Sequence, residues 1–126
     1  MKLGNYTVQN KKLKKIICFD LDNVLCKTKN KDYKNAKPIK NNIIKVNELF
    51  KKGHVIKIFT ARYMGRNNEN ILAAKKQGYK MTYSQLKKWG VSFHKLLFGK
   101  PSFDLFIDDK SIYFKKKWNK DINNYI

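Results

Sequence analysis

Two short apolar runs on either side of one amphipathic segment constrain the fold of this chain most strongly. The first run, Ile16 to Phe19, is continuous and begins with β-branched residues, which predicts a strand buried on both faces. Residues 38–53 carry apolar side chains at helical spacing, with Pro38 in the first turn and Gly53 at the end. The second run, His54 to Thr60, follows so closely that a parallel crossover through the helix is expected. The sequence therefore predicts a β-α-β unit.

The rest of the chain continues this alternation of elements. Residues 23–37 are rich in Asn and Lys and predict an irregular loop or a small hairpin. A second helix is expected to reach about Gln77 and stop at Gly78, and Thr82 with Gln85 has the spacing of a capping box that would begin a further short helix ending at Gly90.

Two more apolar runs complete the predicted sheet. Residues 93–98 predict a strand, Phe103 to Asp109 predicts another, and a helix is expected at the C-terminus. The first 13 residues are expected to be a polar extension or an edge hairpin. We predict one α/β domain, Rossmann-like and three-layered, with a mostly parallel sheet.

The charge of the chain raises the question of a nucleic-acid partner. The formal net charge is +20, from 29 Lys and Arg against 9 Asp and Glu. Only two of the basic residues are Arg, and the lysines are spread over every segment. Because base and phosphate recognition usually recruits the planar fork of Arg, a chain-wide compositional drift is favoured over a nucleic-acid surface.

Cysteine content and hydropathy indicate the compartment. Cys18 and Cys26 are too few for a disulfide framework, and no histidine stands at zinc-ligand spacing. The N-terminus has no apolar core of signal-peptide length, and no run approaches the ~20 apolar residues of a membrane span. We expect a cytoplasmic protein that does not act at a membrane.

Four of the nine acidic residues stand at the ends of two predicted strands. Asp20 and Asp22 follow the first strand, and Asp108 and Asp109 end the last one. In a parallel sheet with these strands as neighbours, the four carboxylates would converge where ligands usually bind. Their mutual repulsion requires a cation, and oxygen ligands without histidine predict Mg²⁺.

Groups suited to a phosphate stand at the same predicted edge. Thr60 ends the second strand with a hydroxyl, followed by the backbone amides of a turn. Lys100 precedes the last predicted strand and could bring an ammonium group. Together with a metal, these groups predict a phosphate site.

Four short motifs resemble those of the haloacid dehalogenase superfamily of phosphohydrolases, in order and context. They are "DLDNV" at residues 20–24, "IFT" at 58–60, "GK" at 99–100 and "IDD" at 107–109, so the resemblance spans most of the chain. Two details depart from the family pattern: Val24 stands where Thr is frequent, and Lys100 lies only eight residues before Asp108. Lys95 is therefore the alternative to Lys100.

The resemblance implies a role for each motif residue. Asp20 would be the nucleophile that becomes an aspartyl phosphate, and Asp22 the general acid and then the general base. Mg²⁺ would be held by Asp20, the backbone carbonyl of Asp22 and Asp108, with Asp109 supporting the site from outside the ligand set. Phosphate oxygens would be held by Thr60, Ala61 and Lys100.

The spacing of the motifs also bears on the substrate. Only 37 residues separate Asp22 from Thr60, which leaves no room for a cap domain. The chain resembles small capless phosphatases of capsule or surface-polysaccharide biosynthesis, which implies a small phosphorylated metabolite such as a sugar or polyol phosphate. The open site would accept a large substrate or be covered by a neighbouring subunit of a homo-oligomer.

Several alternatives stay open from the sequence. Arg62 and Arg66 follow Thr60 closely and either reach a substrate anion or form solvated surface. A nucleic-acid terminal phosphatase would use the open site and the positive charge together. A non-catalytic basic binding module would use the acids only structurally.

Overall fold

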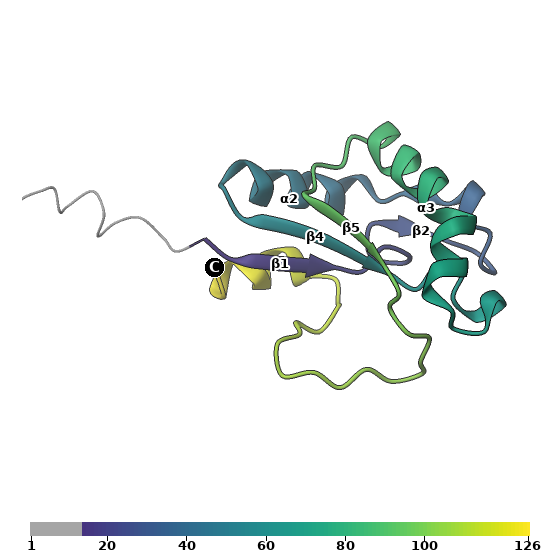
Figure 1. Ribbon diagram of the computed structural model, residues 1–126. Coiled ribbons are helices and arrows are strands. Elements are labelled where there is room, and N and C mark those ends of the chain that lie inside the picture. The colour runs from purple at the N-terminus through teal and green to yellow at the C-terminus, as the bar shows by residue number, and fades with distance from the viewer. Residues whose placement is uncertain (1–13) are drawn as a thin grey trace, which may run out of the picture.

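The computed structural model describes residues 14–126, so the predicted N-terminal extension lies outside the described residues (Figure 1). The described chain forms a mixed α/β domain. Its strands and α-helices are β1 (Ile16–Phe19), β2 (Cys26–Lys27), β3 (Lys37–Pro38), α2 (Lys40–Lys51), β4 (Val55–Thr60), α3 (Ile71–Lys88), β5 (Lys95–Phe98) and α4 (Trp118–Asp121). Short 3₁₀ turns lie at Tyr33–Asn35, Gly65–Asn67 and Ile122–Asn124.

The main sheet is parallel and has the order β1-β4-β5. The predicted β-α-β unit is confirmed, since α2 connects the parallel neighbours β1 and β4. The loop at residues 23–37 contains the small antiparallel hairpin of β2 and β3, which is one of its two expected forms.

Helices cover one face of this sheet. Ile56 and Ile58 are fully buried, and their register neighbours Phe19 and Leu96 are buried on the same face. The opposite face is half-buried or exposed, and Cys18 lies on it. The expectation of three layers, with β1 buried on both faces, is wrong for residues 14–126, because β1 alternates between a covered and an open face.

Helix α2 packs against β4 through one apolar stripe. Ile43, Val46 and Leu49 are buried at spacings of three residues, which places them on a single helix face. The predicted end is confirmed, since Gly53 adopts a φ of +97° that side-chain-bearing residues rarely adopt. The predicted start is wrong: Pro38 pairs with Cys26 in the hairpin, so the helix begins two residues later.

Helix α3 is continuous over 18 residues, which corrects the predicted break at Gly78. Its start is capped by Asn70, whose side chain accepts a hydrogen bond from the Ala73 amide at 2.9 Å. Gly78 and Thr82 lie in its interior and are buried. The capping-box prediction is wrong because the Thr82 hydroxyl contacts Arg62 instead of an amide of its own helix.

Gly78 is required because the ring of Tyr63 occupies the space of its missing side chain. A Cβ at this position would lie 2.1 Å from Cε2 of Tyr63 and 2.2 Å from Cδ2. We expect Gly78→Ala to lower the free energy of unfolding by about 1–3 kcal/mol through overpacking, a cost larger than the ~1 kcal/mol that Ala gains in helix propensity. Urea unfolding checks this, and an unchanged or raised midpoint would contradict it.

The expected strand at Phe103 to Asp109 is not formed. This segment belongs to a long irregular connection outside the sheet, drawn in yellow-green in Figure 1, and Leu105 and Ile107 are 82% and 94% exposed. Its aromatic rings pack locally, because Phe103 and Phe106 stack with centroids 4.9 Å apart and both face the ammonium of Lys100. These rings therefore have partners near the end of β5 and not along the edge of β1.

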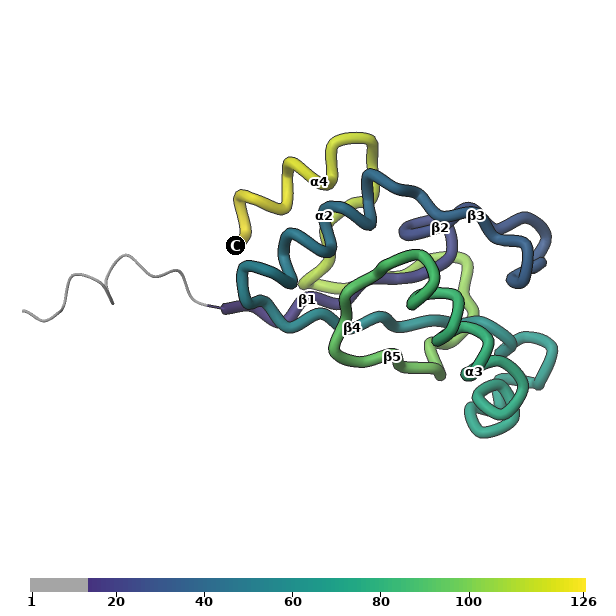
Figure 2. The backbone as a smooth tube through the Cα atoms, turned by 90° about the horizontal axis from the view of Figure 1, so that it is seen from above, coloured from purple at the N-terminus to yellow at the C-terminus, as the bar shows by residue number. Residues whose placement is uncertain are grey.

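The C-terminal helix is present but short. Helix α4 lies beside α2 (Figure 2), where Trp118 donates a hydrogen bond to the side chain of Asn42 at 3.3 Å and meets Phe19 edge-on at 5.8 Å. Within residues 14–126 no helix has the length and apolar character needed to cross a membrane.

His54 makes the stability of the fold depend on pH. Burial, with the nearby charges of Lys14, Lys52 and Lys15, lowers the pKa of His54, and its Nδ1 accepts a hydrogen bond from the Lys15 amide at 3.0 Å. The unfolded chain therefore binds a proton at a higher pH than the folded chain. The stabilisation is complete above the ordinary pKa of about 6.5 and is lost as the pH falls through the folded value.

We expect His54→Asn to remove this part of the pH dependence, because an Asn oxygen can accept from the same amide and does not titrate. The measurement is urea unfolding of both proteins at pH 7.5 and 5.5. The wild-type protein should lose more stability between these pH values than the variant. Equal losses would show that His54 does not contribute.

Candidate functional site

The tight turn after β1 positions the two acids of the first motif. Asn23 adopts a left-handed φ of 67°, which Asn tolerates better than most residues, and its amide donates to the Cys26 carbonyl at 2.6 Å. The Leu25 amide donates to the Leu21 carbonyl at 2.9 Å, and both leucines are fully buried. Anchoring these leucines in the core leaves Asp20 and Asp22 facing a cleft.

The cleft lies at the carboxyl ends of the parallel strands and has a volume of about 750 Å³. Its walls come from the loop after β1, the turn after β4 and the segment after β5. They are lined mainly by polar and charged side chains: Asp20, Asp22, Asn23, Thr28, Asn30, Lys31, Tyr33, Ala61, Arg62, Gly65, Lys100, Pro101, Ser102, Phe103 and Asp104.

Asp20 pairs with Lys100, the lysine that the sequence analysis expects at this edge of the sheet. The Lys100 ammonium lies 3.3 Å from Oδ2 of Asp20, and the backbone of Lys100 is fixed because its amide donates to the Thr60 carbonyl at 3.2 Å. Oδ1 of Asp20 accepts from the Leu21 amide at 2.8 Å. One oxygen of Asp20 is thus held by the backbone, and the other faces a cation in the cleft.

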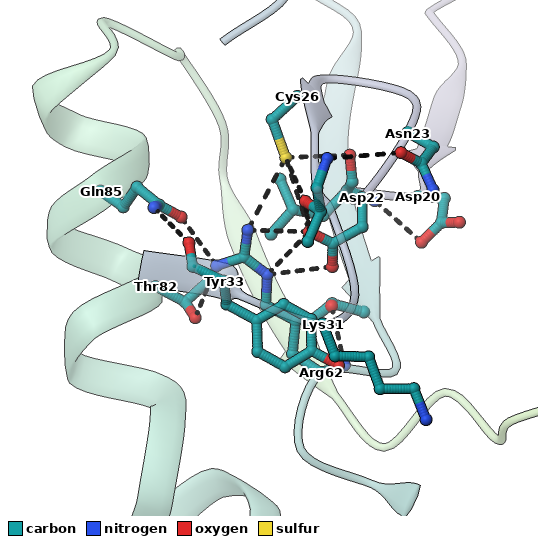
Figure 3. Close-up of polar contacts among 12 residues, drawn as sticks. Asp20, Asp22, Asn23, Cys26, Lys31, Tyr33, Arg62, Thr82 and Gln85 are labelled. Atoms are coloured by element: carbon teal, nitrogen blue, oxygen red, sulfur yellow. Dashed lines mark hydrogen bonds and ion pairs between the residues drawn. The ribbon is translucent and has the colours of Figure 1, made fainter. Parts of the chain in front are cut away.

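Asp22 pairs with the second cation of the site, Arg62 (Figure 3). Nη2 of Arg62 lies 2.9 Å from Oδ1 of Asp22, and Nε lies 3.1 Å from Oδ1 and 3.0 Å from Oδ2. The side chain of Arg62 is completely buried, whereas that of Asp22 is 21% exposed. The pair joins the turn after β4 to the loop after β1.

The hairpin adds two further contacts to Asp22. The Thr28 hydroxyl and the Cys26 thiol both donate to Oδ1, the thiol at 3.5 Å. Burial raises the pKa of Cys26, so its thiol keeps the proton that it donates. Oδ1 of Asp22 is therefore surrounded by donors from three side chains.

Each acid of the first motif thus has its own side-chain cation. Lys100 comes from the segment after β5 and Arg62 from the turn after β4. These two cations offset the repulsion between Asp20 and Asp22 that the sequence assigned to a metal ion.

The other predicted phosphate ligands differ in how they reach the cleft. Ala61 lines it, but Thr60 is fully buried, and its hydroxyl accepts from the Arg62 amide at 3.1 Å. The Thr60 side chain thus stabilises the turn from within. Lys95 stands at the start of β5, at the end of the strand away from the cleft, so the structure favours Lys100.

The acids of the last motif do not join the other two. Asp108 and Asp109 are exposed on the irregular connection and do not line the cleft. A hydrogen bond from the Lys110 amide lowers the pKa of Asp108, a local effect of its own turn. The expected convergence of four carboxylates fails because the strand that would carry Asp108 to the sheet edge is not formed.

The described part of the chain brings together only part of the expected magnesium ligand set. Residues 14–126 contain no group of three or more His, Cys, Asp or Glu side chains that could hold a metal. Of the three expected contributors, Asp20 pairs with Lys100, Asp22 pairs with Arg62, and Asp108 lies elsewhere. Magnesium is usually held by one or two carboxylates together with waters and a substrate phosphate, and Asp20 and Asp22 are the expected contributors that line the cleft.

The two arginines occupy different environments. Arg62 is not available to a substrate anion because its guanidinium is buried and paired, which corrects that expectation. Arg66 is exposed, stacks on the rings of Tyr33 and Tyr63 and donates to the Lys31 carbonyl at 3.2 Å. It does not line the cleft.

Helix α3 supports the site through contacts that the sequence did not predict. Gln85 accepts from Nη1 of Arg62 at 2.7 Å and donates to the Tyr33 carbonyl at 2.8 Å. The ring of Tyr33 packs against the guanidinium with a centroid distance of 4.9 Å. The spacing of Thr82 and Gln85 could have indicated this support, because residues three apart lie on the same face of a continuous helix.

Comparison with known proteins identifies the fold. No protein-family model and no curated protein matches the chain. Among solved structures it is similar to the crystal structure of an MCSG target from Vibrio cholerae, with a TM-score of 0.74 and 24% identity over 90% of this chain and 98% of the other. The description of that protein names no function. The likeness shows a shared α/β fold.

Proposed function

We propose that the chain is a phosphoric monoester hydrolase of the haloacid dehalogenase type that works through an aspartyl phosphate on Asp20. The observation that carries the proposal is the meeting of Asp20, Asp22 and Lys100 at one cleft, at the carboxyl ends of parallel strands. Ligands of α/β sheets bind at this edge, and a lysine beside a carboxylate suits an incoming phosphoryl group.

The first step of the proposed reaction transfers the phosphoryl group to the enzyme. Asp22 takes up a proton from solvent before this step. Oδ2 of Asp20 then attacks phosphorus, the bond from phosphorus to the leaving oxygen breaks, and Asp22 donates its proton to that oxygen. Lys100 offsets the negative charge on the phosphoryl oxygens, which is supported by its position 3.3 Å from Oδ2. Ala61 lines the cleft, which supports its amide as a contact to a phosphoryl oxygen.

The second step releases phosphate. Asp22, now without its proton, accepts a proton from water as the water oxygen attacks phosphorus. The bond between phosphorus and Asp20 breaks, inorganic phosphate leaves and the Asp20 carboxylate is restored. Asp22 regains its proton, so the cycle balances with one water consumed for each phosphomonoester.

The proposed substrate is a small phosphorylated metabolite such as a sugar or polyol phosphate. The cleft offers the amides of Asn23 and Asn30 and the hydroxyls of Thr28 and Ser102, which are suited to the hydroxyl groups of such a molecule. The proposal that the reaction belongs to surface-polysaccharide biosynthesis rests on the sequence resemblance alone. The proposal that a neighbouring subunit covers the open cleft has the same basis.

Magnesium dependence stays a prediction from the sequence. We expect purified protein to hydrolyse p-nitrophenyl phosphate with Mg²⁺ and to lose this activity reversibly on treatment with EDTA. Activity that survives thorough chelation would contradict the requirement for Mg²⁺ but not the proposed roles of Asp20 and Lys100. No turnover of any phosphomonoester under either condition would contradict the proposed function and favour a non-catalytic basic binding module.

A second candidate keeps the chemistry and changes the substrate. A nucleic-acid terminal phosphatase is favoured by the net charge of +20 and by Lys31 and Lys100 at the cleft. Its activity on a terminally phosphorylated oligonucleotide would fall steeply with salt as phosphate contacts are screened. Equal rates on the oligonucleotide at low and high salt would dismiss this candidate.

A further inference from the structure

The guanidinium of Arg62 has a partner for every N–H group that it carries (Figure 3). Nε and Nη2 contact Asp22, Nη1 contacts Thr82 at 3.3 Å and Gln85 at 2.7 Å, and Nη2 also faces the Cys26 sulfur at 3.7 Å. Arginine has five N–H donors in a rigid planar fork, so these contacts fix its orientation.

The position of the fork is held by helix α3. The Gln85 side chain accepts from Nη1 and donates to the Tyr33 carbonyl, which determines how its amide group is turned. Tyr33 in turn packs its ring against the guanidinium. A displacement of Arg62 would break contacts to α3 and to the segment around Tyr33 together.

This arrangement makes the two oxygens of Asp22 unequal. Oδ1 accepts from Nε and Nη2 of Arg62, from the Thr28 hydroxyl and from the Cys26 thiol. Oδ2 accepts only from Nε, at 3.0 Å, among the described residues. A carboxylate oxygen offers about two lone-pair sites, so the free capacity lies on Oδ2.

We propose that Arg62 is a positioning residue that turns Asp22 so that Oδ2 is the atom that gives and takes the proton. The inference rests on the proposed function, because it assigns the proton transfer of that reaction to one atom. Arg62 does not touch the substrate; it acts through Asp22, with Thr28 occupying the other oxygen.

The test uses two substrates that differ in their need for a proton. The p-nitrophenolate group leaves readily without protonation, whereas the alkoxide of glycerol 3-phosphate requires it. Arg62→Lys keeps a positive charge but cannot hold both oxygens through a planar fork. We expect it to lower kcat/KM, which reports the phosphoryl-transfer step, at least about tenfold more for glycerol 3-phosphate than for p-nitrophenyl phosphate.

Asp22→Asn serves as the reference, since it removes the proton donor and should shift the ratio of the two kcat/KM values in the same direction. The matched structural control is Leu49→Ala, which opens the core at the end of α2 away from the cleft. It should reduce the amount of folded protein without changing the ratio. A ratio that moves in Arg62→Lys and Asp22→Asn but not in Leu49→Ala supports the inference.

The outcomes separate the inference from the proposed function. Wild-type protein that hydrolyses neither substrate would contradict the proposed function and the inference with it. Wild-type activity on both substrates, with an unchanged ratio in Arg62→Lys, would overturn the inference alone. If Arg62→Lys does not fold, Gln85→Ala is read in the same way, because it removes the acceptor that fixes Nη1 and so lets the fork turn relative to Asp22.

Discussion

Asp20→Asn is expected to leave at most a few per cent of the phosphatase activity, the largest effect of any single substitution on the proposed reaction. The amide oxygen of Asn is a far weaker nucleophile than a carboxylate, so the aspartyl phosphate cannot form. The fold should be retained, because an Asn oxygen can still accept from the Leu21 amide as Oδ1 of Asp20 does at 2.8 Å. Initial rates with p-nitrophenyl phosphate measure the effect.

The matched control is Asp121→Asn, the same chemical change on α4. Asp121 pairs with Lys115 and does not line the cleft. We expect its activity to equal that of the wild-type protein. Activity of Asp20→Asn above a few per cent, with a normal unfolding transition, would remove Asp20 from the role of nucleophile.

Arg62→Leu is expected to have the largest effect on stability. Removing a buried ion-pair partner leaves an uncompensated charge, and the usual cost is about 3–5 kcal/mol. We expect the lower end, about 3 kcal/mol, because Asp22 keeps 21% of its side chain exposed to water. The loss of the contacts to Thr82 and Gln85 acts in the same direction. Urea unfolding of the variant gives the value.

Arg66→Leu provides the comparison on the neighbouring exposed arginine. Its interactions with the rings of Tyr33 and Tyr63 are at the surface and should contribute only about 0.5–1 kcal/mol. A double-mutant cycle of Arg62→Leu with Asp22→Asn would then isolate the pair. Equal effects of the two arginine substitutions would show that burial of the pair with Asp22 does not determine the stability.

The sequence predicts the elements whose residues determine structure locally. The β-branched runs predict β1 and β4, and Gly53 and Gly90 predict helix ends where the backbone adopts positive φ. The predicted helix end at Gly78 was wrong because glycine also occurs where another group approaches the backbone closely. The approaching group is the ring of Tyr63, fifteen residues away in the chain, and no local pattern reveals it.

The candidate site could also be predicted only where the local sequence determines the position of a residue. Strand-end positions place Asp20, Asp22 and Lys100 at one edge of the sheet, and the structure brings them to one cleft. The partner of Asp22 could not be predicted, because a basic residue after a strand reaches either solvent or the interior according to tertiary packing. The predicted position of Asp108 was wrong for a related reason, because an apolar run forms a strand only if it can pair with a sheet edge.

The most direct test of the proposed mechanism is the mass of the protein after acid quenching during turnover of a phosphomonoester. We expect a fraction of the wild-type chain to carry one additional phosphoryl group on the peptide that contains Asp20, and none of the Asp20→Asn chain to carry it. Turnover with no phosphorylated chain in a rapid quench, or the same modification in Asp20→Asn, would contradict the central role of Asp20.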